Sequence, residues 1–155
     1  MESLDPRVVQ YWRIQGVARL FAFWLPVSIA VGVGLSLRGG MVYGLGAAAV
    51  ILGLNLLATL ILPPLAYARY HYAVREHDLL VEHGVIFRHT TSIPLDRIQH
   101  VDTRQGWIER SFGLSQLIVY TAAGLSADGS IPGLDEHHAA ELRDQLSRRS
   151  ADDGV

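Results

Sequence analysis

Hydrophobic residues fill the chain from Leu20 to Ala68, and the only charged side chain in this stretch is that of Arg38. A helix of about 20 apolar residues crosses the hydrocarbon core of a bilayer, so the run on each side of Arg38 is long enough for one span. Neither run has the polar stripe that helices of a water-soluble protein keep on one face. The pattern therefore predicts two membrane-spanning helices, and not a soluble helical pair or a cleaved signal peptide, whose apolar region would be shorter.

Charges and prolines set the expected limits of this transmembrane helical hairpin, which we assign to residues 17–68. Its helices are expected at about 17–37 and 41–62, because Pro63 and Pro64 remove two backbone donors and should end the second one. Residues 1–16 precede the hairpin and are expected to form a short cytoplasmic segment.

The arginines are distributed unevenly around the two spans. Three precede the first span and two follow the second, against one in the loop between them: Arg7, Arg13 and Arg19; Arg69 and Arg75; Arg38. Because positively charged residues stay on the cytoplasmic side, we expect a plasma-membrane protein with two spans and both termini in the cytoplasm.

Small residues recur at intervals of four within both predicted helices. Such spacing lets helix backbones approach closely in lipid, so we treat these positions as candidates for helix–helix packing. Glycine and alanine are also common in membrane helices, which explains the pattern equally well. The candidates are Ser28, Gly32 and Ser36 in the first helix and Ala49 and Gly53 in the second.

After Arg69 the pattern changes to the alternation that is typical of strands. An amphipathic helix is expected from Glu136 to about Arg149, with Asp135 as its N-cap. We therefore assign residues 69–149 to one α+β domain that folds without the hairpin, an antiparallel β-barrel or sandwich capped by a C-terminal helix, and residues 150–155 to a disordered tail. The predicted strands are 70–74, 79–83, 85–92, 98–103, 114–121 and 130–133.

Composition and charge remove several classes of function. The chain has no cysteine, so it holds neither disulfides nor thiolate metal sites. Its net charge of −2 gives no basic footprint for nucleic acid. Four histidines recur every six residues from His71 to His89, a spacing that matches no metal motif. With no phosphate-binding loop, nucleophile motif or informative pair of carboxylates, we predict no enzymatic activity, no catalytic residues, no cofactor and no metal.

Two strings of residues carry a family resemblance. Residues 72–86 read Tyr-Ala-Val-Arg-Glu-His-Asp-Leu-Leu-Val-Glu-His-Gly-Val-Ile, and residues 93–101 read Ile-Pro-Leu-Asp-Arg-Ile-Gln-His-Val. With the shorter strings at 105–106, 110–114 and 131–134, they resemble the YdbS-like family of bacterial pleckstrin-homology-like (PH-like) domain membrane proteins. The resemblance implies two roughly orthogonal antiparallel sheets capped by a C-terminal helix. It supplies no catalytic residues, and the molecular role of the family is not established.

The expected function is that of a membrane-anchored, non-enzymatic binding or scaffold module on the cytoplasmic face, which engages protein or lipid. One alternative is a structural or stress-related membrane protein that self-associates through its hairpin. Another is an accessory subunit of a membrane transport or enzyme complex, although the spans lack the ionisable residues that transport would favour. The expected partners are the lipid bilayer and a protein or a second copy. Specific phosphoinositide binding is not favoured, because the first predicted hairpin, at 75–78, has mixed charge.

The candidate interaction surface follows the Gln-Gly turn at 105–106. Trp107 and Ile108 are large apolar residues directly after this turn, a position that is usually exposed. Arg104 and Arg110 flank them and would give an apolar tip with cationic sides. The alternative is that Trp107 folds back onto the core of the domain, as large aromatic residues usually do.

Overall fold

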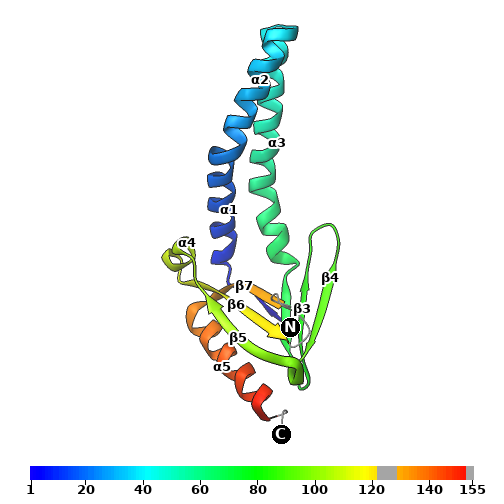
Figure 1. The fold of residues 1–155 in the computed structure, drawn as a ribbon, viewed down its shortest axis with the longest axis vertical. Coiled ribbons are helices and arrows are strands. Elements are labelled where there is room, and N and C mark those ends of the chain that lie inside the picture. Colours follow the sequence, from blue (N-terminus) through cyan, green and yellow to red (C-terminus); the bar gives the residue numbers. More distant parts are fainter. Residues whose placement is uncertain (122–128, 153–155) are drawn as a thin grey trace. The chain divides into compact units, whose positions relative to one another are not determined.

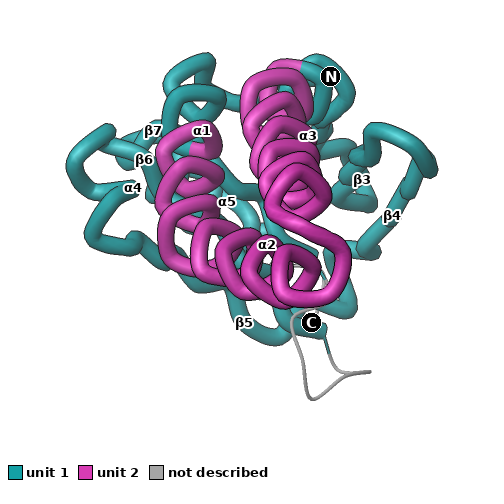
Figure 2. Tube along the Cα trace, turned by 90° about the horizontal axis from the view of Figure 1, so that it is seen from above, with its two compact units in different colours: residues 1–11, 65–155 teal, residues 12–64 magenta. Residues whose placement is uncertain are grey.

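The computed structural model describes residues 1–121 and 129–152 of the chain, which forms two compact units (Figure 2). Unit 1 comprises Met1–Tyr11 and Leu65–Val155, and unit 2 comprises Trp12–Pro64. Over the described residues the chain has two long apolar helical runs, then two antiparallel sheets and a C-terminal helix (Figure 1). The predicted α+β fold class is therefore confirmed.

The first helical run is continuous from Arg7 to Gly39 and has three parts. Helix α1 (Arg7–Arg19) is followed by a π-helical segment (Leu20–Trp24) and by α2 (Leu25–Gly39). Pro26 lies in the first turn of α2, which directly follows the π-helical segment. Helical structure thus begins ten residues before the predicted start at residue 17, because polar residues of the N-terminal segment also adopt it.

Gly40 makes the tight reversal that leads into α3 (Met41–Ala68), with a φ of 99° that suits glycine. The predicted helix end at Leu62 is wrong, since α3 continues through Pro63 and Pro64. The fixed φ of proline is compatible with a helix, and membrane helices tolerate its missing donor. Both runs, of 33 and 28 residues, are long and apolar enough to cross a membrane.

The strands of unit 1 form a four-stranded and a three-stranded antiparallel sheet. The first has the order β1-β2-β3-β4, with β1 at Glu2–Ser3, β2 at His71–Val74, β3 at Asp78–His83 and β4 at His89–Pro94. A 3₁₀ turn (Leu95–Arg97) leads to the second, formed by β5 (Ile98–Arg104), β6 (Leu114–Thr121) and β7 (Gly129–Asp135). The short helix α4 (Trp107–Ser111) connects β5 to β6.

Helix α5 (Glu136–Asp152) closes unit 1 by packing on the second sheet, as the amphipathic pattern predicts. Its apolar residues Ala139, Leu142 and Leu146 are buried. They lie at the spacing that puts side chains on one helix face. The tail predicted at 150–155 is helical as far as Asp152, and residues 153–155 lie outside the described part of the chain.

The N-terminal segment contributes to the core of unit 1. Strand β1 pairs with β2, with Glu2 opposite Tyr72, and the Tyr72 hydroxyl donates a hydrogen bond of 2.8 Å to Glu2 Oε2. Leu4, Val8 and Tyr11 are buried, and the backbone N–H of Asp5 donates to the carbonyl oxygen of Gly133 at 3.1 Å. Residues 1–11 are thus part of the domain, which corrects their sequence-based assignment to a separate cytoplasmic segment. Their apolar pattern was too short to predict this.

Candidate interaction surface

Helix α4 is a single exposed turn that buried contacts hold in place. Oε2 of Glu109, a residue only 8% exposed, accepts the backbone N–H of Gly106 at 2.6 Å. Gln105 Nε2 donates to the carbonyl oxygen of Leu114 at 2.9 Å. Gly113 ends the turn with a φ of 64°, a conformation that glycine adopts without strain. Hydrogen bonds made by Glu109 and Gln105 therefore hold the backbone between Arg104 and Leu114 in place.

The structure brings the four predicted surface residues into this one connection but orients them differently. Trp107 is 85% exposed, so its ring lies outside the core of unit 1. Arg104 and Arg110 are also exposed, whereas Ile108 is partly buried. The exposed side chains of this connection thus include the indole of Trp107 and the side chains of the two arginines that flank it in the sequence.

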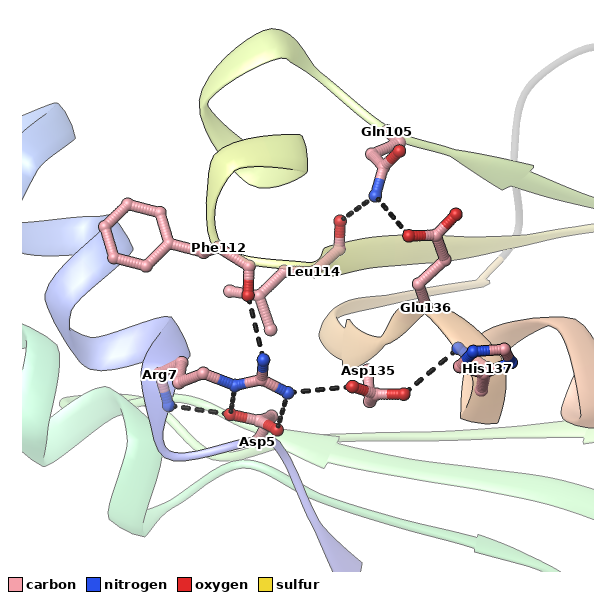
Figure 3. Close-up of polar contacts among 8 residues, drawn as sticks. All are labelled: Asp5, Arg7, Gln105, Phe112, Leu114, Asp135, Glu136 and His137. Atoms are coloured by element: carbon pink, nitrogen blue, oxygen red, sulfur yellow. Dashed lines mark hydrogen bonds and ion pairs between the residues drawn. The ribbon is translucent and has the colours of Figure 1, made fainter.

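Arg7, which was not among the candidate surface residues, fixes the end of α4 (Figure 3). Arg7 donates from Nη1 to the carbonyl oxygen of Phe112 at 3.0 Å. Its Nη2 donates to both Asp5 Oδ2 and Asp135 Oδ2 at 2.8 Å, and its Nε donates to Asp5 Oδ1 at 2.9 Å. We call Arg7, Asp5, Asp135 and the Phe112 carbonyl the Arg7 clamp. It joins the start of α1, the end of α4 and the start of α5.

The two carboxylates of the Arg7 clamp are stabilised in their charged form. The hydrogen bond from Arg7 holds the pKa of Asp5 below its usual value, against a smaller opposing effect of burial. The same donor lowers the pKa of Asp135, which also accepts the backbone N–H of His137 at 3.0 Å. Asp135 therefore caps α5, as its position before the helix predicts. The spacing of Asp5 and Arg7 was the only local signal of the clamp in the sequence.

The candidate packing residues of the hairpin divide into two groups. Ser28 and Gly32 are buried, and a Cβ atom built on Gly44 would overlap the Gly32 carbonyl and the Ser36 hydroxyl. Gly32 and Ser36 thus meet α3 at Gly44, where the two backbones come close. Ala49 and Gly53 are exposed, and a Cβ atom on Gly53 would meet nothing within 4 Å. The structure therefore does not bring these two residues to the contact between α2 and α3.

The histidines do not gather into a metal site. His83 and His89 face each other across β3 and β4, and their rings stack with centroids 5.6 Å apart. The Tyr70 ring also stacks with the His83 ring, with centroids 5.6 Å apart. Over residues 1–121 and 129–152, no three His, Cys, Asp or Glu side chains are placed to hold a metal ion.

These features define a class of protein, in which two long apolar helices are joined to a PH-like unit of two antiparallel sheets and a closing helix. The chain belongs to the Bacterial PH domain family, whose model matches residues 17–150. It is 32% identical, over 158 aligned residues, to UPF0699 transmembrane protein YdbS of Bacillus subtilis (strain 168). That alignment covers 99% of this chain and 96% of the relative. No solved structure matches the chain.

The family match gives the class of protein but not its molecular function. The chain is a transmembrane bacterial PH-domain protein with two candidate spans, and it falls in a family of unknown function. The matches indicate no enzymatic family. Unit 1 is called the PH-like unit below.

Proposed function

We propose that this protein is a non-enzymatic binding module that its hairpin anchors in the plasma membrane, with the PH-like unit on the cytoplasmic face. The observation that carries the proposal is the exposure of Trp107, at 85%, between two exposed arginines on a fixed turn. Large apolar side chains that stay exposed on a folded domain mark interaction sites, and Trp and Arg are the residues that contribute most to binding at such sites.

Substitution of Trp107 by alanine tests this role in the full chain. Because the side chain has little contact with the core, we expect the thermal midpoint of the protein to stay unchanged. Proximity labelling from the C-terminus in native membranes should lose specific neighbours in Trp107→Ala. The matched control is Arg97→Ala, an exposed position on the 3₁₀ turn, which should retain them. A thermal midpoint lowered by several degrees, as truncation of a core aromatic would cause, or an unchanged labelling pattern would contradict the proposal.

The cytoplasmic placement rests on the arginine distribution and has its own test. Reporter fusions after Val155 and within the loop at 38–40 should report opposite sides of the membrane. A periplasmic C-terminus would reject the orientation.

Self-association through the hairpin is a second candidate, and the outward position of Ala49 and Gly53 favours it. Small residues four apart on a free helix face allow another helix to approach. Under this hypothesis Gly53→Leu lowers the yield of cross-linked dimer in membranes, while Gly34→Leu, at another position with nothing within 4 Å, leaves it unchanged. Equal yields in both variants and the wild type would remove this candidate.

A further inference from the structure

The turn between β3 and β4 carries a second exposed apolar tip. Ile86 is 84% exposed and Phe87 is 76% exposed. Turns usually place glycine, proline or small polar residues at such positions, because they lie in water. An isoleucine and a phenylalanine next to each other at the tip of a hairpin are therefore surface that a partner would cover.

This tip is held in place, and its support is the residue that follows α3. Arg69 directly follows Ala68, the last residue of α3, and its Nη1 donates to the Val85 carbonyl oxygen at 3.1 Å. On the other side of the turn, Arg88 Nη2 donates to Glu82 Oε2 at 2.7 Å. Gly84 has a φ of 127°, which suits glycine and closes the turn tightly. The two apolar side chains are thus fixed beside the end of a candidate span.

Within unit 1, the β3–β4 turn and α4 lie at the same end (Figure 1). The start of α1 and the residue that follows α3 are bonded to these two segments, since Arg7 Nη1 donates to the Phe112 carbonyl oxygen and Arg69 Nη1 donates to the Val85 carbonyl oxygen. The two tips are on different sides of unit 1 (Figure 2). A partner that covers both must therefore extend across the end of the unit that is connected to the spans.

We propose that Ile86, Phe87 and Trp107 insert into the boundary between headgroups and acyl chains of the glycerophospholipid bilayer. This inference deepens the proposed function and rests on its membrane-anchored arrangement. A bilayer is a surface wide enough to reach both tips. Arg69, which directly follows α3, is hydrogen-bonded to the β3–β4 turn, and Arg7, the first residue of α1, is hydrogen-bonded to the end of α4. Tryptophan is enriched at this depth of membranes, and apolar side chains of interfacial segments bury about 5–10 Å into it.

The polar surroundings of the β3–β4 tip suit the same occupant. A depression of about 250 Å³ beside the turn is lined by Arg69, Arg88, Glu82 and their neighbours. Guanidinium groups form strong hydrogen bonds with phosphate. Because Glu82 already pairs with Arg88, the local positive charge is small. This favours the single phosphate of an ordinary phospholipid over a multiply phosphorylated headgroup.

The absence of native cysteine makes a direct test simple. Single-cysteine variants Phe87→Cys, Trp107→Cys and Asp96→Cys of the full chain are spin-labelled and reconstituted at low density in vesicles of phosphatidylethanolamine and phosphatidylglycerol. Asp96 is the matched control, because it is exposed and lies beyond the opposite end of β4. The measurement compares label collisions with oxygen, which concentrates in lipid, and with a water-soluble nickel chelate. We expect the ratio of oxygen to chelate collisions to be several-fold higher at positions 87 and 107 than at position 96.

Other outcomes overturn the inference and separate it from the proposed function. If position 87 is as accessible to the chelate as position 96, the β3–β4 turn does not enter lipid. If both tips are aqueous in these vesicles but shielded in native membranes, a protein covers them, and the binding module stands while its lipid occupant is rejected. A third outcome separates the two proposals. If the tips enter lipid but the Trp107→Ala protein keeps the same labelled neighbours and the same depth in the membrane as the wild type, the proposed binding role of α4 is rejected while the lipid insertion stands.

Discussion

Truncation of Val8 to alanine should destabilise the PH-like unit, although more than 60 positions separate Val8 from β2, the next strand of that unit along the chain. Val8 is 0% exposed, and a Cβ atom on Gly133, which follows the middle of β7, would overlap the Val8 side chain. The substitution removes two buried methyl groups, each worth about 0.8 kcal/mol of transfer free energy. With the cavity that remains, the loss amounts to about 2–3 kcal/mol. Domains are stable by only about 5–15 kcal/mol, so this is a large fraction.

Hydrogen–deuterium exchange of the full chain in lipid nanodiscs measures this effect without removing the hairpin. The slowest amides of β6 report global opening of the unit. Their exchange should accelerate roughly 30- to 150-fold, since each 1.4 kcal/mol is a factor of ten. The matched control is Val9→Ala, the same change at the next residue, which is partly exposed and should accelerate exchange much less. Equal exchange in Val8→Ala and the wild type would show that the N-terminal segment is not part of the core.

Three further predictions concern the hairpin, the closing helix and the Arg7 clamp. Gly44→Leu should lower the thermal midpoint of the hairpin in micelles by several degrees, because the leucine side chain would separate two close backbones. Gly34→Leu should leave the midpoint unchanged. Equal midpoints for the two variants, measured by circular dichroism, would disprove the contact. Leu142→Asp, at a position 4% exposed, should unfold the PH-like unit by placing a carboxylate in its core, a loss of several kcal/mol, and protease resistance equal to the wild type would refute this. Because the folded pKa values of Asp5 and Asp135 lie below the usual 3.8, their stabilising contribution is complete above that value and is lost as the pH falls through the lowered values. The stability difference between the wild type and Asp135→Asn should therefore shrink on acidification, and a difference independent of pH would contradict the clamp.

Sequence patterns predicted the parts of the fold in which a pattern extends over many consecutive residues. The uncharged runs around Arg38 identified both helices, and the strand predicted at Leu114–Thr121 is β6 with the same bounds. The apolar spacing of α5 gave its buried face. The prediction was wrong at Pro63, where it relied on the behaviour of proline in soluble helices. It was also wrong at the start of β4, where the apolar residues 85–87 belong to a turn.

Contacts between distant residues were beyond the reach of those patterns. Two-residue strand β1 has no periodicity of its own, and it exists because the edge of β2 is available for pairing. The Arg7 clamp likewise depends on Asp135, which is 128 positions away. For the candidate surface, the sequence located α4 but did not decide between an exposed and a buried Trp107. In the structure Glu109, and not Trp107, is the buried residue of α4.

The PH-like unit is built from segments before and after the hairpin, and this constrains membrane topology independently of hydropathy and charge. Its first sheet pairs Glu2 with Tyr72, and these residues lie on opposite sides of the hairpin in the sequence. A bilayer cannot separate two hydrogen-bonded strands, so the chain must cross it an even number of times between residues 3 and 71. With two candidate spans in this interval, either both cross or neither does. An arrangement in which only one helix spans would separate β1 from β2 and remove Leu4 and Val8 from the core. The fold therefore requires that both helices cross the bilayer or that neither does. Pairing of β1 with β2 can form only after both helices have been synthesised.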